Sequence, residues 1–344
     1  MPIAFTVIVT SDRYGTDSSD FARERELLQD FPDIEVELIG EPGRSEEHLI
    51  AMGQRADALM LSTRDPVSRR VCESIPRVKV IARYGVGLDN VDLQAAADHG
   101  IVITHYPQYC TSEVADHALA MILTMNRRIA ELNQDLHDGA WGTQGRQTAR
   151  IMRGPLNAMF ANTVGVVGLG RIGEAVTARL VPFGSRILIH DPYIDPDAIR
   201  RAGAEPASFD GLIQESDIVT LHCPLTPETR GLLGPEQFAK MKPTVAIVNT
   251  CRGPVVNEAA LIEFLTSNPQ ARAALDVTEI EPLDPDSSLY ALPNVILTPH
   301  AAYFSEQAVR TVREQTFLSA IAVLRGDRPP TIANPAVLER VALA

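Results

Sequence analysis

The stretch TVGVVGLGRIG, residues 163–173, constrains the fold of this chain most strongly. An apolar run is followed by glycines in the spacing G-x-G-x-x-G, at Gly168, Gly170 and Gly173, and then by a helix-compatible segment. The first glycine permits a tight turn, the second lets a pyrophosphate approach the backbone, and the third lets helix and strand pack closely. The pattern predicts a strand, a turn and a helix whose N-terminus binds phosphate groups.

This glycine spacing by itself is also compatible with an ordinary turn in an α/β domain. The flanking sequence favours cofactor binding, because a second apolar run ends at Asp191, close to the expected distance of about 20 residues beyond the glycines. A carboxylate at that position can accept hydrogen bonds from an adenosine ribose and would repel a 2′-phosphate. The sequence therefore predicts NAD rather than NADP as the cofactor.

Short apolar runs alternate with helical patterns along the chain, in two series. Such alternation predicts two domains of the α/β class, each a parallel sheet doubly wound by helices. The expected strands of the first series are residues 5–10, 36–39, 58–61, 79–82 and 101–104, with helices at 22–31 and 46–54. The expected strands of the second series are residues 163–169, 186–191, 218–222, 245–250, 272–277 and 294–300.

A stretch too long and too apolar to be a linker, residues 112–141, separates the two series. Its apolar side chains recur three or four residues apart, so we expect one long packed helix that connects the domains and can contact a second subunit. These side chains are Ala115, Leu119, Ile122 and Met125. Another long helix is expected at 305–326, where it can cross back to the first sheet. The predicted domains are a substrate domain, residues 1–108 and 305–344, and an NAD-binding domain, residues 109–304.

Composition limits the classes of function. The length of 344 residues agrees with two domains, and the net charge of −13 argues against a nucleic-acid surface, which needs clustered Lys and Arg. No run approaches the ~20 apolar residues of a membrane span, and the N-terminal segment lacks the basic start of a signal peptide, so we expect a cytoplasmic protein. The cysteines show no C-x-x-C spacing, so reduced, mostly buried thiols are expected rather than a disulfide framework or a metal site. They are Cys72, Cys110, Cys223 and Cys251.

Three residues with useful chemistry, Arg252, Glu281 and His300, each follow an expected strand of the second series. Carboxyl ends of parallel strands meet at one sheet edge, where ligands bind, so we expect these residues near the cofactor. An arginine fork can grip a carboxylate, and a carboxylate beside an imidazole keeps a proton available near neutral pH. Alone, each residue is as compatible with a solvated loop side chain. Together they predict hydride transfer to or from C2 of a hydroxy acid, with proton exchange at its oxygen.

Several segments resemble the D-isomer-specific 2-hydroxy-acid dehydrogenases: NTCRGPVVNEAAL, ALDVTEIEPL, TPHAA, GLGRIG and ARYGVGLDNVD. The resemblance extends from about residue 50 to the C-terminus. It implies a flavodoxin-like substrate domain and a Rossmann NAD-binding domain. It also implies that Arg252 binds the substrate, that His300 is the acid and base, and that Glu281 pairs with the histidine. Members of this family are usually dimers, so a homodimer is expected.

The resemblance assigns further residues to the cofactor and the substrate. The implied cofactor-binding residues are Gly168, Gly170, Arg171, Ile172, Gly173, Asp191, Pro192, His222, Pro224, Thr229, Thr250, Asp276 and Val114, of which Asp276 approaches the nicotinamide end. The implied substrate-binding residues are Arg83, Tyr84, Gly85, Val86 and Tyr303. The segment 83–87 would supply backbone amides, and Arg83 a guanidinium, to the substrate carboxylate.

Two classes of function remain open. The segment TPHAAYFSEQAVRTVREQ is similar to the C-terminal-binding-protein branch, which includes corepressors that retain the dehydrogenase site, although Tyr303 stands where that branch has a tryptophan. The chain is thus expected to be an enzyme that reduces a small 2-oxo acid, or else an NAD-gated binding protein. A reductase of a non-carboxylate oxyanion such as phosphite is a third possibility. Because only Arg83 is evident as a cation near its loop, an unphosphorylated substrate is favoured.

Overall fold

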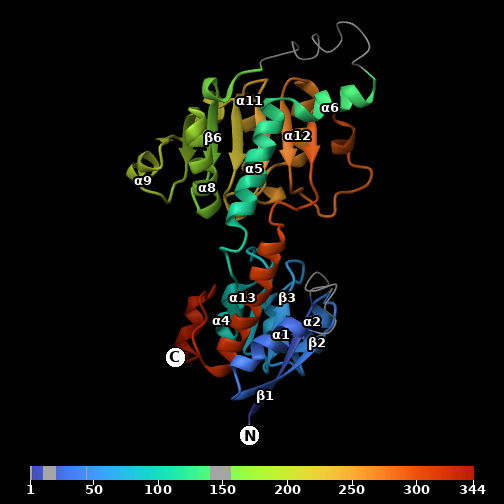
Figure 1. The fold of residues 1–344 in the computed structure, drawn as a ribbon, viewed down its shortest axis with the longest axis vertical. Helices are drawn as coiled ribbons and strands as arrows, with labels where there is room; N and C mark the ends of the chain where they lie inside the picture. Colours follow the sequence, from blue (N-terminus) through green and yellow to red (C-terminus); the bar gives the residue numbers. More distant parts are fainter. Residues whose placement is uncertain (1, 11–20, 44, 140–155) are drawn as a thin grey trace. The chain divides into compact units, whose positions relative to one another are not determined.

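The structure of the protein, a computed structural model, describes residues 2–10, 21–43, 45–139 and 156–344. The chain divides into two compact units (Figure 1). Unit 1 comprises Met1–Tyr109 and Ser305–Ala344, and unit 2 comprises Cys110–Phe304. Each unit is built around its own parallel sheet, as the alternating pattern predicts.

Unit 1 has a five-stranded parallel sheet with the strand order β2-β1-β3-β4-β5. Its strands are β1 Ile3–Val9, β2 Ile34–Gly40, β3 Ala58–Leu61, β4 Val80–Arg83 and β5 Val102–Thr104. Its α-helices are α1 Ala22–Leu27, α2 Glu46–Gly53, α3 Arg69–Ser74, α4 Leu93–Asp98 and α13 Glu306–Arg325.

Alternate residues along the strands of unit 1 enter two separate cores, one on each face of the sheet, as the two-residue period of a strand requires. On one face Val7 and Met60 pack with Phe317 of α13, which returns to this sheet from the far end of the sequence. On the other face Ile8 and Leu59 pack with residues of α2 and α3. Burial on both faces explains why these strands read as continuous apolar runs in the sequence.

Unit 2 has a seven-stranded parallel sheet with the strand order β12-β11-β10-β9-β6-β7-β8. Its strands are β6 Thr163–Val167, β7 Arg186–His190, β8 Glu205–Pro206, β9 Ile218–Leu221, β10 Ala246–Asn249, β11 Arg272–Leu275 and β12 Val295–Leu297. Its α-helices are α5 Thr111–Asn126, α6 Ile129–His137, α8 Arg171–Leu180, α9 Pro196–Arg201, α10 Phe209–Glu215, α11 Pro235–Lys240 and α12 Glu258–Ser267. Only the two-residue strand β8 was not expected from the sequence.

Helices cover both faces of the sheet in unit 2 (Figure 1). Residues of α5 and α8 pack with Val164 and Ile189 on one face. Residues of α10, α11 and α12 pack with Val219 and Ile247 on the other. The order of the strands reverses at β6, whose neighbours are β7 and β9. In doubly wound sheets, ligands bind at the carboxyl edge beside this reversal.

The prediction of one long helix over residues 112–141 was wrong. Helix α5 ends at Asn126, and Arg128 adopts a left-handed backbone conformation with φ 52° before α6 begins. Partners outside the helix bind its last turn: the side chain of Arg272 donates to the carbonyl of Met125 at 2.8 Å, and Asn162 donates to the Asn126 side chain at 2.9 Å. The contact of Arg272 satisfies a backbone carbonyl that the next turn would otherwise bind, and the contact of Asn162 fixes the last side chain of the helix. Residues 140 and 141 of the predicted helix lie outside the described residues.

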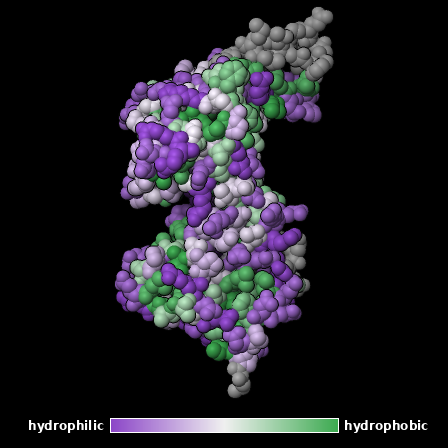
Figure 2. Space-filling view, turned by 60° about the vertical axis from the view of Figure 1, so that its left-hand side comes forward, coloured by the Kyte–Doolittle hydropathy of each residue, from purple (hydrophilic) through white to green (hydrophobic). Residues whose placement is uncertain are grey.

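Among the residues that the structure describes, no helix combines the length and the apolar character needed to cross a membrane. Figure 2 shows hydrophilic and apolar residues interspersed over the visible face.

Candidate active site

The glycine segment forms a strand, a tight turn and a helix, as its spacing predicts. Strand β6 leads into Gly168, which has φ +92°, and α8 begins at Arg171. A Cβ atom on Gly168 would lie 2.9 Å from the carbonyl of His222, and one on Gly173 would lie 2.0 Å from the oxygen of Gly168. Both positions therefore exclude any side chain, which keeps the N-terminus of α8 close to the end of β6.

Gly170 differs, because a Cβ atom there would meet no protein atom within 4 Å. The open space lies beside the N-terminus of α8, whose first backbone N–H groups have no partner within the helix. Asp191 follows β7, and its carboxylate accepts hydrogen bonds from the N–H groups of Leu169 at 2.8 Å and of Tyr193 at 2.9 Å. The carboxylate is therefore fixed beside the glycine turn.

His300 and Glu281 form a hydrogen-bonded pair. Nδ1 of His300 lies 2.7 Å from Oε2 of Glu281, and both side chains are partly exposed. Burial alone would raise the pKa of Glu281, but the hydrogen bond from His300 and the nearby positive charges of His300 and Arg252 hold that pKa below its ordinary value. Glu281 is thus an acceptor that stays ionised, which fixes Nδ1 of the imidazole as a donor and leaves Nε2 for chemistry.

Asp276 holds the backbone around His300. The histidine has φ 54°, a left-handed conformation that is rare for a residue with a Cβ atom. Its N–H donates to the carbonyl of Asp276 at 2.8 Å. The buried Asp276 carboxylate accepts from the N–H groups of Ala301 at 2.8 Å and Ala302 at 2.9 Å, and from the hydroxyl of Thr298 at 2.5 Å. Four hydrogen bonds therefore hold the loop that presents the imidazole.

Arg252 is positioned by a turn at the end of β10. The side-chain oxygen of Asn249 accepts from the N–H of Cys251 at 3.0 Å, while its amide nitrogen donates to the carbonyl of Arg252 at 3.0 Å. The guanidinium donates to the carbonyl of Cys251 at 2.7 Å. Gly253 follows, and a Cβ atom there would lie 1.7 Å from the carbonyl oxygen of Thr278. Only glycine lets this loop approach the loop that carries Glu281.

The remaining predicted residues of unit 2 lie on the same elements. His222 follows β9 and its Nε2 lies 2.9 Å from the hydroxyl of Thr220, while burial lowers the pKa of His222 to about 3, so this imidazole is neutral. The hydroxyl of Thr229 donates to the carbonyl of Pro224 at 2.6 Å and fixes the following loop. The ring of Tyr303 meets that of His300 edge to face, with centroids 6.4 Å apart. Val114 is buried in α5, whereas Arg171, Ile172 and Pro192 are at least partly exposed.

Unit 1 carries the other predicted substrate residues, among them Arg83. The Arg83 side chain is only 1% exposed and donates to the carbonyl oxygens of Ser62 and Gly87 and to the side chain of Asn90. Its guanidinium therefore braces two loops of unit 1, and its expected contact with a substrate carboxylate stays a prediction. The backbone of Tyr84, Gly85 and Val86 lies in the loop that it braces, where Gly85 has φ +141°.

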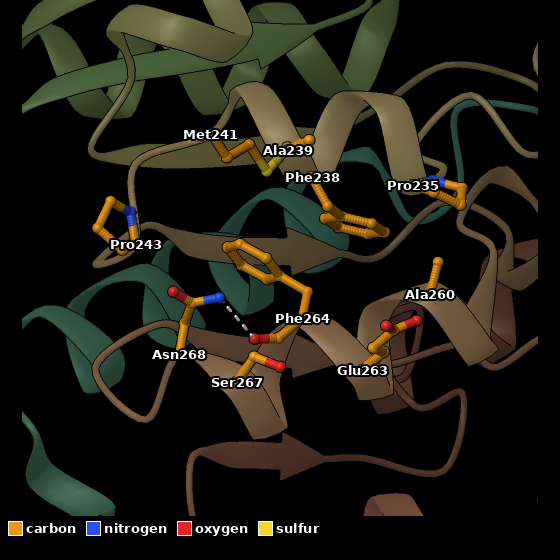
Figure 3. A pocket seen from close by; sticks show the side chains of 10 residues that line it. All are labelled: Pro235, Phe238, Ala239, Met241, Pro243, Ala260, Glu263, Phe264, Ser267 and Asn268. Atoms are coloured by element: carbon orange, nitrogen blue, oxygen red, sulfur yellow. Dashed lines mark hydrogen bonds between the residues drawn. The ribbon is translucent and has the colours of Figure 1, made fainter.

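A cavity of about 330 Å³ in unit 2 lies between α11 and α12 (Figure 3). Most of the residues that line it are apolar, among them Phe238 and Phe264, whose stacked rings lie 5.3 Å apart between centroids. None of the predicted site residues lines it. It is therefore separate from the carboxyl edge described above.

The family description "D-isomer specific 2-hydroxyacid dehydrogenase, NAD binding domain" matches residues 119–302, more than half of the chain. The chain belongs to this family. Two relatives in this family are similar to this chain over most of its length. A glyoxylate reductase of Korarchaeum cryptofilum is 38% identical over 295 residues, which cover 86% of this chain and 88% of the relative. A D-3-phosphoglycerate dehydrogenase of Mycobacterium leprae is 38% identical over 301 residues, 88% of this chain but only 55% of the relative.

Among solved structures, a D-lactate dehydrogenase of Aquifex aeolicus complexed with NAD and lactic acid is 26% identical, with a TM-score of 0.78 over 98% of both chains. The protein is accordingly an NAD-dependent oxidoreductase that acts on CH–OH groups. The phosphoglycerate dehydrogenases are about twice as long as the part that this chain matches.

The residues of unit 2 fit NAD. The space beside Gly170 and the close packing at Gly168 and Gly173 are what a pyrophosphate at a helix N-terminus needs. In addition, Nδ1 of His222 and the hydroxyl of Thr250 are buried polar atoms without a hydrogen-bond partner in the described part of the chain. Such atoms are rare in proteins unless a ligand or water binds them.

Sequence reasoning missed several residues that hold the predicted site residues in place. Asn249 sets the turn of Arg252, and Thr298 links Asp276 to Nε2 of His117 in α5 at 3.1 Å. Asparagine at the end of a strand is a known turn former and could have suggested the first role. The contact of His117 joins two elements that lie 181 residues apart, and no local pattern predicts it.

Proposed function

We propose that the protein catalyses the NAD-dependent interconversion of a small, unphosphorylated 2-oxo acid and the corresponding D-2-hydroxy acid. The hydrogen bond between His300 and Glu281 carries this proposal. It belongs to the same unit as the glycine turn, and it follows β12 and β11, whose carboxyl ends lie at the same sheet edge as that of β6. An imidazole with an ionised carboxylate on Nδ1 is suited to give and take a proton at Nε2.

In the proposed reaction each side chain has one task. Arg252 grips the substrate carboxylate with two N–H groups and polarises the C2 carbonyl. During reduction His300 donates the proton on Nε2 to the C2 oxygen, while Glu281 stabilises the imidazolium before this transfer. In the reverse direction neutral His300 removes the proton from the C2 hydroxyl. When bound, NADH supplies the hydride that C2 receives.

We assign the cofactor to the carboxyl edge of unit 2. The pyrophosphate would lie beside Gly170 at the N-terminus of α8, and Asp191 would accept hydrogen bonds from the adenosine ribose. His222, Pro224, Thr229 and Thr250 would flank the cofactor, together with Arg171, Ile172, Pro192 and Val114. The unpaired hydroxyl of Thr250 supports its place in this set.

Unit 1 is proposed as the substrate domain and unit 2 as the NAD-binding domain. The loop of Tyr84, Gly85 and Val86 would border the substrate carboxylate, with the N–H of Val86 as its donor, because the N–H of Tyr84 donates to the carbonyl of Leu61 at 2.9 Å and that of Gly85 to the carbonyl of Arg83 at 3.1 Å. Arg83 would hold this loop in shape. Tyr303 is proposed to border the substrate through its edge contact with His300. A homodimer in the cytoplasm, as expected from the family resemblance, completes the proposal.

The substrate class is tested by following NADH oxidation with glyoxylate, pyruvate, hydroxypyruvate and phosphohydroxypyruvate. We expect the highest kcat/KM for one of the three acids without a phosphate. A clear preference for phosphohydroxypyruvate would contradict the proposed substrate class, since relatives of both kinds exist. Loss of turnover in His300→Ala on the same substrate separates enzymatic reduction from background oxidation.

The second candidate is an NAD(H)-gated binding protein of the C-terminal-binding-protein type. The similarity of residues 298–315 to that branch favours this candidate. In addition, two large apolar side chains are exposed close in sequence to His300 and Glu281, namely Phe304 and Ile280, and exposed apolar side chains are suited to binding a protein partner. The complete set of Arg252, Glu281 and His300 favours the enzyme, because a binding protein would be free to lose it. Tight NADH binding without turnover of any acid in the panel would favour the binding protein.

A further inference from the structure

Two cysteines lie at neighbouring strand ends beside the glycine turn of unit 2. Cys223 follows β9 and Cys251 follows β10, and the parallel register pairs Leu221 with Asn249. Both strands end at this pair, and each cysteine lies two residues beyond it, so the two thiols follow neighbouring strand ends at the same sheet edge. Adjacent strands lie about 4.8 Å apart, which falls within the range of about 4.4–6.8 Å between the Cα atoms of a disulfide.

The two thiols are free and partly buried, and each shifts the pKa of the other. The contact with the Cys251 side chain lowers the pKa of Cys223, and this effect outweighs burial, which raises it. The same contact and burial raise the pKa of Cys251 well above its ordinary value. Cys223 is therefore the thiol that ionises first and reacts first, and Cys251 is placed to resolve it.

The surroundings connect this pair to both parts of the site. The backbone nitrogen of Cys223 lies 3.0 Å from where a Cβ atom of Gly168 would stand, and the charge of Asp191 acts on the Cys223 thiol. The Cys251 thiol donates to the side-chain oxygen of Asn249 at 3.1 Å. That same Asn249 side chain holds the carbonyl of Arg252. A change at the two sulfur atoms thus reaches the glycine turn and the arginine.

We propose that Cys223 and Cys251 form an oxidation site, at which a peroxide converts the two thiols to a disulfide and thereby weakens the binding of NAD(H). The disulfide removes the S–H donor of Cys251 from Asn249 and draws together the ends of β9 and β10. Linkage requires the converse effect: bound NADH disfavours formation of the disulfide by the same factor by which the disulfide weakens binding.

The chemistry is a two-electron oxidation by hydrogen peroxide. The Cys223 thiolate attacks one peroxide oxygen, the O–O bond breaks, and a sulfenic acid and hydroxide form. The sulfur of Cys251 then attacks the sulfenic sulfur, the S–S bond forms and the hydroxyl leaves as water with the Cys251 proton. The hydroxide takes up the proton that Cys223 released. Overall, two thiols and one peroxide give one disulfide and two water molecules.

The test treats the whole purified protein with hydrogen peroxide, with and without saturating NADH, and then blocks remaining thiols. Peptide mass mapping without reductant should find a Cys223–Cys251 disulfide, and bound NADH should suppress it. The Kd of NADH, measured by fluorescence, should rise at least tenfold after oxidation and return after treatment with dithiothreitol. Each variant is compared with itself before and after peroxide.

Cys223→Ser should lose this response, because the reactive thiol is gone, whereas the matched control Cys110→Ala should respond as the wild type does. Cys110 is a buried cysteine of the same unit outside the pair. The absence of the disulfide, a disulfide without a change in Kd, or an undiminished response of Cys223→Ser would each overturn the proposal. Since no 2-oxo acid is used, the outcome is independent of the proposed substrate reaction.

Discussion

The substitution Asp276→Asn tests whether one buried carboxylate sets the position of His300. In the wild type, Oδ1 accepts from Thr298 and Ala301, and Oδ2 accepts from the N–H of Ala302 at 2.9 Å. The asparagine oxygen can retain the first two contacts, but its NH₂ group then faces the N–H of Ala302. Two donors oppose each other at a residue that is 4% exposed, where water cannot replace the lost acceptor.

The expected size of the effect follows from these contacts. An unsatisfied buried N–H costs about 1–3 kcal/mol. His300, with φ 54°, already occupies a backbone conformation that costs about 1–2 kcal/mol, so its loop will relax when the anchor weakens. If this free energy is lost from the arrangement that transfers the proton, kcat falls about 5- to 150-fold, because 1.36 kcal/mol corresponds to a factor of ten.

The assay measures kcat and KM for the best 2-oxo acid, together with the Kd of NADH and the pH profile of kcat. Thr298→Val is the matched control, since it removes one hydroxyl and leaves both N–H bonds to Asp276, and its loss of kcat should be smaller. An unchanged kcat in Asp276→Asn would refute a positioning role. A loss confined to the Kd of NADH would instead make Asp276 a cofactor ligand, as the family resemblance implies.

Four further predictions concern single residues. His300→Ala should lower kcat at least 100-fold, within the range of about 10²–10⁴ for acid–base groups, while the Kd of NADH stays nearly constant by fluorescence titration; comparable activity would remove the histidine from the mechanism. The lowered pKa of Glu281 keeps this side chain ionised, and its negative charge stabilises the imidazolium of His300. In Glu281→Gln this stabilisation is lost, so the pH above which 2-oxo acid reduction declines should shift to lower values. An unshifted pH profile would make the glutamate structural. Asp191→Ala should reduce the kcat/KM ratio of NADH over NADPH at least tenfold, unless another group reads the ribose. Burial lowers the pKa of His222 from 6.5 to about 3 in the folded state, so the unfolded state binds a proton first as the pH falls. Below pH 6.5 the wild type should therefore lose stability faster than His222→Gln. Parallel losses of stability in denaturation measurements of the two proteins would show that the burial of His222 has no such effect.

Much of the fold could be predicted because strands buried on both faces leave long apolar runs in the sequence. The predicted strand at residues 163–169 corresponds to β6, Thr163–Val167, and the one at 245–250 to β10, Ala246–Asn249. Because the strands pair in parallel, the residues that follow them lie at one edge of the sheet, so the sequence alone could predict that Arg252 and His300 follow strands at the same edge as the glycine turn. Strand β8 could not be predicted, because two residues are too few to show the alternation of apolar and polar side chains, or the apolar run, that marks a strand.

The parts that could not be predicted depend on partners far away in the sequence. Apolar residues continue at helical spacing through Met125, Ile129 and Leu132, yet the side chain of Arg272 binds the backbone carbonyl of Met125 and α5 stops at Asn126. Arg83 stands in a glycine-rich loop, which suggested an open cation for a carboxylate. The carbonyl of Ser62 and the side chain of Asn90, which bury it, belong to other turns of unit 1.

The three segments that carry the predicted catalytic residues are informative because each contains both such a residue and the group that holds it. Asn249 lies three residues before Arg252 and binds its carbonyl, and Thr278 lies three before Glu281, with its N–H 3.4 Å from Oε1 of that carboxylate. Thr298 lies two before His300 and is tied to Asp276. The close approach of Gly253 to the carbonyl of Thr278 then joins two of these segments through backbone contact. The chemistry of the site therefore depends on short stretches of backbone geometry at adjacent strand ends, and a substitution that preserves the reacting residue but alters its local anchor should impair turnover while leaving the sheet intact.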